Sequence, residues 1–331
     1  MGIYIVKRLL TMIPLWILLS TITFFLIELP PGDVVSNEVI ALRAQNVEVD
    51  ETTIARMRAQ WGLDDAFLAR YLRWVENIVI RGDLGSTVDG RENIDVLLET
   101  LPYTIIIGLS SLILSLGLAI PLGIFSATHQ YSIADYIITF LAFAGLGAPG
   151  WLLAIIVAWA SLYFLDFVPL GINSLEYLAA PMSWEKAIDT AKHLWAPILL
   201  TALPSIGGTI RVVRNNLLDQ LGQQYVVTAR AKGLKEPKLV RKYPVKIALN
   251  PLISDFGMLV YGIVAGQGLI GIVLGLPTLG PLLLHSLLAQ DMILAGTILL
   301  IYASVIWLAT LASDVLLAWF DPRIRFEGTA R

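Results

Sequence analysis

The amino-acid sequence predicts an all-α integral membrane protein with six transmembrane helices. Of its 331 residues, 56% are hydrophobic and 15% are charged, whereas soluble domains carry about 25% charged residues. No Asp, Glu, Lys or Arg occurs within residues 100–134, 136–165 or 256–290. Uncharged apolar runs of about 18 residues or more are long enough to cross a bilayer as helices. Composition and spacing therefore indicate a chain that crosses the membrane several times.

Residues 9–29 form the first apolar stretch, and we interpret them as a retained transmembrane helix. The stretch has about 20 residues, whereas the hydrophobic core of a secretory signal peptide has about 7–15. No small-residue cleavage site follows, because Glu28, Pro30 and Pro31 lie at its end. The hydropathy predicts five further spans, at roughly 103–126, 134–165, 194–214, 247–275 and 291–319.

Glycine and proline residues interrupt the predicted spans at two places. The third span is too long for one straight helix. We expect residues 145–150, which read GLGAPG, to kink it, because proline removes a backbone donor and clashes with the preceding turn. After the fifth span, residues 275–281 are rich in glycine and proline and predict irregular backbone at the membrane surface. Such backbone is tolerated where protein or water satisfies its polar groups.

The distribution of basic residues predicts that both termini lie in the cytoplasm, because cytoplasmic loops are enriched in Lys and Arg. With that orientation, most of the 23 Lys and Arg residues are cytoplasmic, and the outward-facing segment contains more acidic than basic residues. The predicted organisation is an N-terminal transmembrane helix (1–30), an extracytoplasmic segment (31–100), a five-helix core (101–320) with a cytoplasmic loop at 215–246, and a cytoplasmic tail (321–331).

The extracytoplasmic segment has the apolar periodicity of two short amphipathic helices. Large apolar side chains recur at spacings of three, four and seven residues, as on one face of a helix. The two stripes comprise Ile54, Met57 and Trp61, and then Phe67, Tyr71, Trp74 and Ile78. A stripe of this kind could pack against the membrane portion, lie in the lipid interface or meet an external partner.

The composition excludes several kinds of site. The chain has no cysteine, and its three histidines (His129, His193 and His285) have no metal-ligand spacing. We therefore predict no disulfide scaffold, no metal and no cofactor. The pattern G-x-x-x-x-G-K-[ST] is absent, so the sequence has no P-loop to bind nucleotide phosphates. Energy for transport would have to come from a partner or an ion gradient.

Residues 224–234, in the longest cytoplasmic loop, are the strongest candidate for a functional site. They are expected to form a short helix on which Ala229, Ala231 and Gly233 lack bulk, so that another surface can approach the backbone closely. Arg230 and Lys232 place positive charge beside that surface. Gly233 is expected to end the helix, because glycine adopts the left-handed conformation of helix C-termini. From the residues alone, a docking element and a basic loop that only follows the positive-inside rule are equally open.

Within this stretch, residues 228–234 (TARAKGL) resemble the EAA-type cytoplasmic loop of ABC importer permeases. The form is that of the dipeptide/oligopeptide (peptide/nickel/oligosaccharide) permease family. Five further short motifs occur in the family's order, at residues 5–9, 29–33, 61–64, 82–86 and 321–325. The resemblance covers nearly the whole chain, and the long outer segment after the first span is similar to that of the family's B-type subunit.

The resemblance implies a type I ABC importer permease (MetI-like) core, which forms a translocation pathway and catalyses no reaction. The implied partners are a second homologous permease, two cytoplasmic ABC ATPases, an extracytoplasmic solute-binding protein and the lipid bilayer, with no nucleic acid. The implied location is a bacterial or archaeal inner membrane. In such importers, ATP-driven closure of the ATPase dimer acts through the EAA loops and switches the cavity from inward-facing to outward-facing.

Carried onto this sequence, the resemblance assigns the EAA loop to residues 221–234. Ala229 and Gly233 would seat the loop in an ATPase groove, and Arg230 and Lys232 would make polar contacts there. The implied coupling residues are Gln224, Tyr225, Thr228, Ala229, Arg230, Ala231, Lys232, Gly233 and Leu234.

The sequence departs from the family pattern in two places. The family often has an acidic residue before Tyr225, where this chain has Gln224. Its Glu-Thr-x-Phe-x-x-Pro-Gly-x-Gly stretch after the fifth span corresponds here to residues 271–280, without the Glu and the Phe. Because that region is expected near the outer mouth, the second departure bears on cargo. Peptides are the leading expected cargo and oligosaccharides the alternative. The candidate pathway or gate residues are Trp151, Gly271, Pro277 and Gly280.

Two other classes of function remain as alternatives. An ion-coupled secondary transporter would need ionisable residues within the membrane, and Asp255 and Asp314 are the candidates, although each could instead pair with a basic residue near the inner surface. An intramembrane serine hydrolase would need Ser and His facing each other. Ser286 directly follows His285, so the two side chains diverge on a helix, and the sequence disfavours this alternative.

Overall fold

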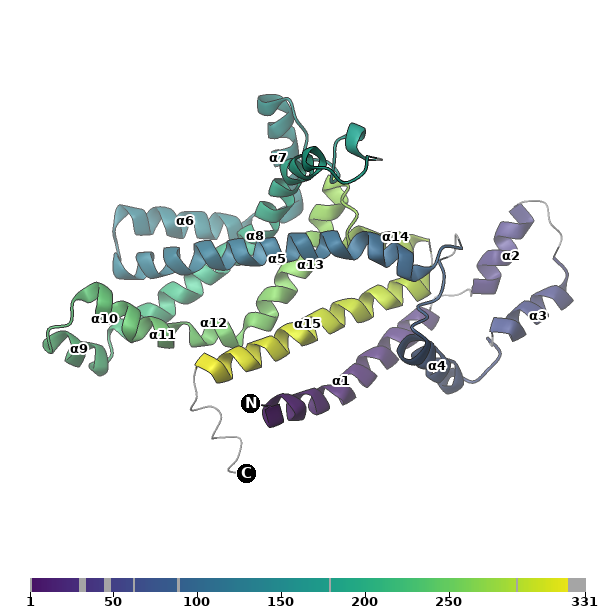
Figure 1. The fold of residues 1–331 in the computed structure, drawn as a ribbon, viewed down its shortest axis with the longest axis horizontal. Coiled ribbons are helices and arrows are strands. Elements are labelled where there is room, and N and C mark those ends of the chain that lie inside the picture. Colours follow the sequence, from purple (N-terminus) through teal and green to yellow (C-terminus); the bar gives the residue numbers. More distant parts are fainter. Residues whose placement is uncertain are drawn as a thin grey trace. The chain divides into compact units, whose positions relative to one another are not determined.

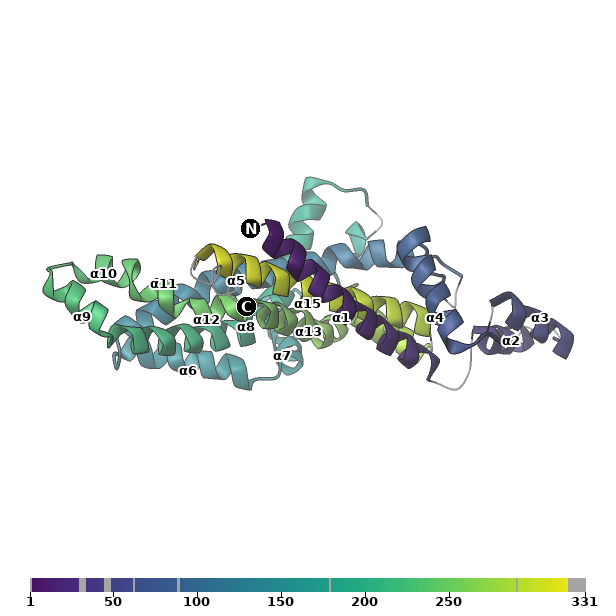
Figure 2. The ribbon, with the colours of Figure 1, turned by 90° about the horizontal axis from the view of Figure 1, so that it is seen from below.

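The chain folds almost entirely into helices. The computed structural model describes residues 2–29, 34–44, 49–61, 63–87, 90–178, 180–289 and 291–320 of the chain. Within these ranges there is no β-strand, only an isolated bridge between Ser86 and Glu92. Figures 1 and 2 show the helices from two directions. The prediction of an all-α protein is confirmed.

Apolar helices of spanning length agree with the predicted membrane topology. In the described part of the chain, five helices are long and apolar enough to cross a membrane, and a bent pair brings the number to six if the pair is one span. The five are α1 (Gly2–Glu28), α5 (Asn93–Thr128), α8 (Trp184–Leu221), α13 (Phe256–Leu274) and α15 (Met292–Phe320), and the pair is α6 (Ile133–Gly147) with α7 (Gly150–Leu165).

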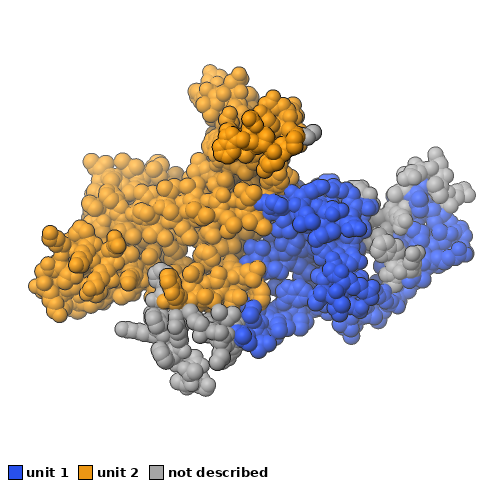
Figure 3. Space-filling model, in the orientation of Figure 1, with its two compact units in different colours: residues 1–102, 282–305 blue, residues 103–281, 306–331 orange. Residues whose placement is uncertain are grey.

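The helices group into two compact units, coloured separately in Figure 3. Unit 1 comprises residues 1–102 and 282–305, and unit 2 comprises residues 103–281 and 306–331. Unit 1 also holds α2 (Val34–Ala44), α3 (Glu51–Trp61), α4 (Phe67–Glu76) and the π-helix η1 (Asn77–Arg81). Unit 2 also holds the 3-10 helix η2 (Leu175–Tyr177), α9 (Gln224–Ala231), α10 (Glu236–Lys242), α11 (Pro244–Ala248) and α12 (Asn250–Ser254). Residues of α14 (Leu279–Leu288) belong to both units.

In unit 1, the apolar stripe of α4 packs against α1. The centroid of the Phe24 ring lies 5.4 Å from that of Phe67 and 5.3 Å from that of Trp74. Arg70 Nη2 lies 2.8 Å from Glu28 Oε2, which ties the same two helices together. Aromatic pairs at such distances contribute about 0.5–1.5 kcal/mol beyond their area burial. Of the three roles left open for this stripe, the structure shows packing against a spanning helix.

The motif at residues 82–86 turns the chain from η1 into α5. Gly82 (φ 66°) and Gly85 (φ 79°) both adopt the left-handed conformation, which glycine accepts without strain. The Asp83 carboxylate accepts a hydrogen bond from the Gly85 amide at 2.8 Å, and the Asn93 side chain donates to the Leu84 carbonyl at 2.8 Å. The motifs at 29–33, 61–64 and 321–325 lie wholly or partly outside the described residues, as do the predicted tail and the Trp61 side chain.

Helix α8 is central to unit 2, where it packs against α6, α7, α11, α12 and α13. The closest approach is at Gly207, where an added Cβ atom would lie 2.3 Å from the carbonyl oxygen of Ala142 on α6. Buried Ala119, Ile206 and Ile210 fill the space beside this crossing. Small residues at a helix interface allow backbones to approach closely in membranes. The position of α6 on α8 therefore depends on a glycine at 207.

The third predicted span consists of two helices that are sharply bent against each other. The axes of α6 and α7 differ by 104°, and Ala148 and Pro149 between them have extended backbones, with ψ near 125°. The break falls within the predicted kink at 145–150. The bend is larger than a proline kink within one helix, because Ala148 and Pro149 both leave the helical conformation and Pro149 has no backbone amide to donate.

Several helix boundaries differ from the predicted spans. Helices α5 and α8 begin at Asn93 and Trp184, about ten residues before the predicted starts, because polar first turns precede their apolar segments, and that of α8 is capped. The Ser183 hydroxyl, for example, accepts a hydrogen bond from the Lys186 amide at 3.2 Å. The fifth span begins at Phe256, not at 247. Prolines in the first turns of α11 and α12 divide the preceding residues into two short helices.

The stretch after α13 also differs from its prediction. Gly275 (φ 63°) ends α13 in the left-handed conformation, but the irregular backbone then lasts only until residue 278. Residues 279–288 form the apolar helix α14. Pro281 lies in the first turn of α14, where backbone amides have no acceptor within the helix, so the missing N–H of proline breaks no hydrogen bond there. A proline taken as a sign of irregular backbone is therefore a helix-starting residue.

A buried ion pair joins α6 to α8. Asp135 is 2% exposed and accepts two hydrogen bonds of 2.9 Å, from Nε and from Nη2 of Arg214. Ser126 of α5 donates to the same carboxylate and accepts from Arg214 Nε at 3.0 Å, and the Tyr131 amide donates at 3.0 Å. Asp135, at the start of the third predicted span, is thus buried among three helices. Its partners compensate for the cost of burying a charge.

Replacing Asp135 by Asn would leave Arg214 without its carboxylate. Removing one partner of a buried ion pair destabilises a protein by about 3–5 kcal/mol. We therefore expect D135N to lower the thermal unfolding midpoint of the purified chain substantially. The matched control is D65N, which removes a half-exposed carboxylate paired with Arg73 and should cost about 0–1 kcal/mol. Equal midpoints for the two variants would contradict the structural role of Asp135.

Candidate functional site

The candidate loop folds as a helical hairpin of α9 and α10 beyond the end of α8 (Figure 1). Its apolar core, which we call the loop cluster, has buried Val226 on α9 and buried Leu239 and Val240 on α10. Partly buried residues surround the core, namely Leu221, Tyr225, Ala229, Leu234 and Val245. A helix of eight residues is marginal in isolation. The loop cluster therefore supplies the stability that α9 lacks.

Helix α9 ends as the sequence predicts. Gly233 has φ 79°, and its amide donates to the Arg230 carbonyl at 2.9 Å, while the Leu234 amide donates to the Ala229 carbonyl at 3.4 Å. These two bonds form a Schellman motif, in which a left-handed residue satisfies the last helical carbonyls. Leu234 then packs into the loop cluster. The turn fixes where the chain leaves α9 and enters α10.

Among the residues of unit 2 that the structure describes, none covers the opposite face of α9. Exposed residues lie there at helical spacing, and their side chains are short or of moderate size. They are Gln224, Val227, Thr228 and Ala231, and Val227 is 47% exposed. Lys232 and Gly233 are exposed at the end of the same helix. A surface of this composition permits close approach of another protein to the α9 backbone.

Two charged groups at the hairpin bind each other. Arg230 on α9 donates to the carboxylate of Glu236 on α10 through Nε and through Nη2, the latter at 3.3 Å. This hydrogen bonding raises the pKa of Arg230 and lowers the pKa of Glu236 from their ordinary values. Both side chains remain about half exposed. The pair links α9 and α10 at the surface and leaves the guanidinium accessible.

The predicted coupling residues divide between the two faces of α9. Gln224, Thr228, Arg230, Ala231, Lys232 and Gly233 are exposed, whereas Tyr225, Ala229 and Leu234 are half-buried. The Tyr225 hydroxyl donates to Gln220 Oε1 at 2.9 Å. Ala229, predicted to seat the loop in a partner, contacts the loop cluster, because it lies one helical turn from buried Val226. Its small side chain serves the contact between α9 and α10.

The loop cluster is continuous with the packing of the spans. Leu221, at the end of α8, and Val245, on α11, belong both to the loop cluster and to a second cluster at the ends of α5 and α8. Buried Ala127, Leu217 and Ala248 form the core of that second cluster. Side chains therefore connect α9 to two spanning helices without a gap. The sequence places Leu221 at the start of the predicted loop but does not single out Val245 or Glu236. Arg230 and Glu236 are six residues apart, which is not a helical contact spacing, so the sequence carried no signal for their pairing.

Three of the four candidate gate residues meet at the turn between α13 and α14. A Cβ atom at Gly271 would lie 2.8 Å from Thr278 Oγ1, and one at Gly280 would lie 2.4 Å from the Cα atom of Gly268. Pro277 lies in the connection between them and is half-buried. The two glycines thus permit close packing of α13 and α14. Trp151 lies apart from these three, in the first turn of α7, and is 44% exposed.

Buried carboxylates in the described residues have structural partners. Asp135 binds Arg214, Asp189 accepts hydrogen bonds from Ser174 at 2.7 and 2.6 Å, and Asp291 accepts from the Leu294 amide at 3.0 Å. The candidates for ion coupling lie elsewhere: Asp255 is exposed at the break before α13, and Asp314 is half-buried on α15. The arrangement offers no support for a proton relay.

Fold and loop together define a class, which is a multi-span helical membrane protein with an exposed helical hairpin packed on the ends of its spanning helices. The chain belongs to the family described as "Binding-protein-dependent transport system inner membrane component", which matches residues 119–326. The N-terminal domain described as "Binding-prot-dependent transport system membrane comp, N-term" matches residues 1–106. The predicted permease family is confirmed.

Similar proteins align along their full lengths. The oligopeptide transport system permease protein AppB of Bacillus subtilis is 30% identical over 328 residues, with 98% of this chain and 100% of the relative covered. The peptidoglycan transport system permease protein YejB of Agrobacterium fabrum is 30% identical over 361 residues, covering 99% of each chain. The oligopeptide transport system permease protein OppB of Haemophilus influenzae is 27% identical over 325 residues, covering 98% of this chain and 99% of the relative.

The end of α9 can be tested with two substitutions of Gly233. No atom lies within 4 Å of a Cβ built there, so the cost of Ala is only that of the left-handed backbone, about 1–2 kcal/mol. We expect G233A to speed hydrogen exchange of the amides of residues 225–232. Because Asn tolerates this conformation better than Ala, G233N is the matched control and should stay closer to the wild type. Identical exchange in G233A and the wild type would contradict the capping role.

Proposed function

We propose that this chain is a pathway-forming permease subunit of an ATP-driven, binding-protein-dependent peptide importer, and that α9 is the element gripped by its ATPases. The observation that carries the proposal is the uncovered face of α9 on a hairpin packed against spanning helices. A basic loop that only obeyed the positive-inside rule would need no such packed core. Membership of the family supports this interpretation.

The coupling mechanism follows from the packing. A partner bound to Gln224, Thr228, Ala231 and Lys232 would move α9, and the loop cluster would transmit the movement through Leu221 to α8. Close-packed interiors transmit displacements because they have little free volume. Closure of an ATPase dimer would thereby re-orient α8 and the helices that contact it. The chain itself contributes binding and motion, and the nucleotide chemistry belongs to the ATPases.

The same proposal defines the partners and the location. A second homologous permease would complete the pathway, two ABC ATPases would bind from the cytoplasm, and an extracytoplasmic solute-binding protein would deliver the cargo. The chain would lie in a bacterial or archaeal inner membrane with both termini in the cytoplasm. Helix α9 would then face the cytoplasm, and α4 would lie on the opposite side.

Peptides are the proposed cargo. Two of the relatives, AppB and OppB, are named as permeases for oligopeptides, and YejB is named as a permease for peptidoglycan. None of the three is named as an oligosaccharide permease. The departures at residues 271–280 affect the α13–α14 turn, where Gly271 and Gly280 serve packing. They therefore give no reason to prefer oligosaccharides.

A bulky residue on the uncovered face of α9 tests the docking function. We expect A231W to abolish peptide uptake in a deletion strain and to reduce co-purification of the ATPases more than about tenfold, since central interface residues contribute 2 kcal/mol or more. Membrane insertion should be unchanged, because Ala231 is exposed.

The matched control is A69W, which makes the same change at an exposed alanine of α4. This variant should retain the ATPases at the wild-type level. Normal uptake and normal ATPase binding by A231W would refute the assignment of α9. Restoration of oligosaccharide uptake, but not of peptide uptake, by the wild-type gene would overturn only the cargo.

The proposed orientation can be tested by thiol labelling, because the chain has no cysteine of its own. K232C, on the exposed end of α9, should react with an impermeant maleimide only after the cells are opened. E92C, at an exposed position before α5, should react in intact cells once the outer barrier is permeable. The reverse pattern would place α9 outside and would exclude its contact with ATPases.

A further inference from the structure

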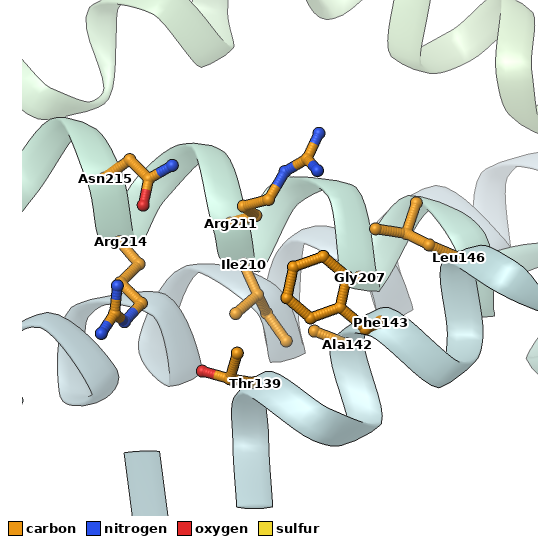
Figure 4. A pocket seen from close by; sticks show the side chains of 9 residues that line it. All are labelled: Thr139, Ala142, Phe143, Leu146, Gly207, Ile210, Arg211, Arg214 and Asn215. Carbon is orange, nitrogen blue, oxygen red and sulfur yellow. The ribbon is translucent and has the colours of Figure 1, made fainter. Parts of the chain in front are cut away.

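An open groove runs along the crossing of α6 and α8, within unit 2 (Figure 4). Its two ends differ in chemistry. Arg211, Arg214 and Asn215 of α8 form one end, and Phe143 and Leu146 of α6 line the other. Gly207 and Ala142 form the floor between the ends, where the two backbones touch.

The two arginines of the groove differ in their pairing. Arg214 is paired with buried Asp135, so that its charge is already compensated. Arg211 is exposed, and among the residues that the structure describes no carboxylate lies within ion-pairing distance, 4.0 Å, of its guanidinium. An uncompensated arginine on a spanning helix is costly unless an anion or water reaches it.

The polarity of the groove follows the depth of the membrane. Tyr131, in the turn before α6, is 72% exposed, and Tyr136, in the first turn of α6, is 62% exposed. Tyrosine is enriched at the membrane–water interface. Asp135 lies between them and pairs with Arg214, so this end of the groove lies at headgroup level. Arg211 is three residues, or about 4.5 Å, deeper along α8, a depth from which an arginine side chain reaches the interface.

The apolar end continues toward the middle of the membrane. Phe143 is 54% exposed and Leu146 is 38% exposed, and both lie on α6 beyond the level of Arg211. A polar, cationic end at the interface followed by an apolar trough matches an acidic phospholipid, with its phosphate at Arg211 and an acyl chain along Phe143. A small soluble anion would make no contact with the apolar side chains of the trough.

We propose that this groove binds an acidic phospholipid. If both termini lie in the cytoplasm, as proposed above, the lipid belongs to the cytoplasmic leaflet. Only this choice of leaflet rests on the proposed function, and the binding of the lipid does not. Basic pockets between spanning helices on the cytoplasmic side are suited to anionic headgroups. The lipid would fill the crossing of α6 and α8 just above the hairpin that α8 carries.

The test is native mass spectrometry of the full chain in detergent, titrated with phosphatidylglycerol. One arginine near the surface contributes about 1 kcal/mol to the binding of acidic lipid, or about fivefold. We expect R211Q to lower phosphatidylglycerol occupancy about fivefold, and F143A to lower it through the acyl chain. The matched control is R241Q, which removes the same charge from exposed Arg241 on α10 and should leave occupancy unchanged.

Other occupants give other results. Equal occupancy for R211Q and R241Q would overturn the proposal. Displacement of the lipid by millimolar inorganic phosphate would also overturn it, because the site would then select a small anion. Loss of partner-permease binding in R211Q with unchanged lipid occupancy would assign the groove to a protein interface. Failure of the importer proposal would appear separately, as normal uptake by A231W with phosphatidylglycerol binding intact.

Discussion

The apolar contact made by Leu221 and Val245 is the constraint on which the functional interpretation depends. Both side chains pack at once against the loop cluster and against the ends of α5 and α8. Without this shared contact, α9 would be a short peptide on a flexible connection, and a partner could move it without moving a span. With it, the hairpin and the ends of α5 and α8 share continuous apolar packing, which the proposed coupling through α9 requires.

Polar contacts inside unit 2 serve the same element. The bidentate pair of Arg214 with Asp135 and the glycine contact at Gly207 fix α6 on α8. Each depends on a residue type that has no good substitute, because a buried charge needs its partner and a close backbone approach needs the absence of a Cβ atom. These interactions hold α8 against its neighbours, as the proposed transmission of movement along α8 requires.

Much of the fold and of the site was predictable from the sequence. Uncharged apolar runs located the spans, and the composition of residues 145–150 and the glycine at 233 located a break and a helix end. Helix starts were missed because capped polar turns, such as that at Ser183, carry no hydropathy signal. The inward face of Ala229 and the burial of Asp135 were missed for another reason: both depend on distant partners, which are a cluster on α10 and an arginine 79 residues away.

The right-angled course of α6 and α7 has a consequence for the surrounding lipid. Their 15 and 16 residues correspond to roughly 22 and 24 Å of helix, and a hydrocarbon layer is about 30 Å thick. Neither rod can traverse that layer alone, and exposed Trp159 and Tyr163 favour an interfacial course for the second one. A change in bilayer thickness should therefore alter the positions of α6 and α7 before those of the straight helices, so the acyl-chain length of the lipids should influence the conformation of the protein.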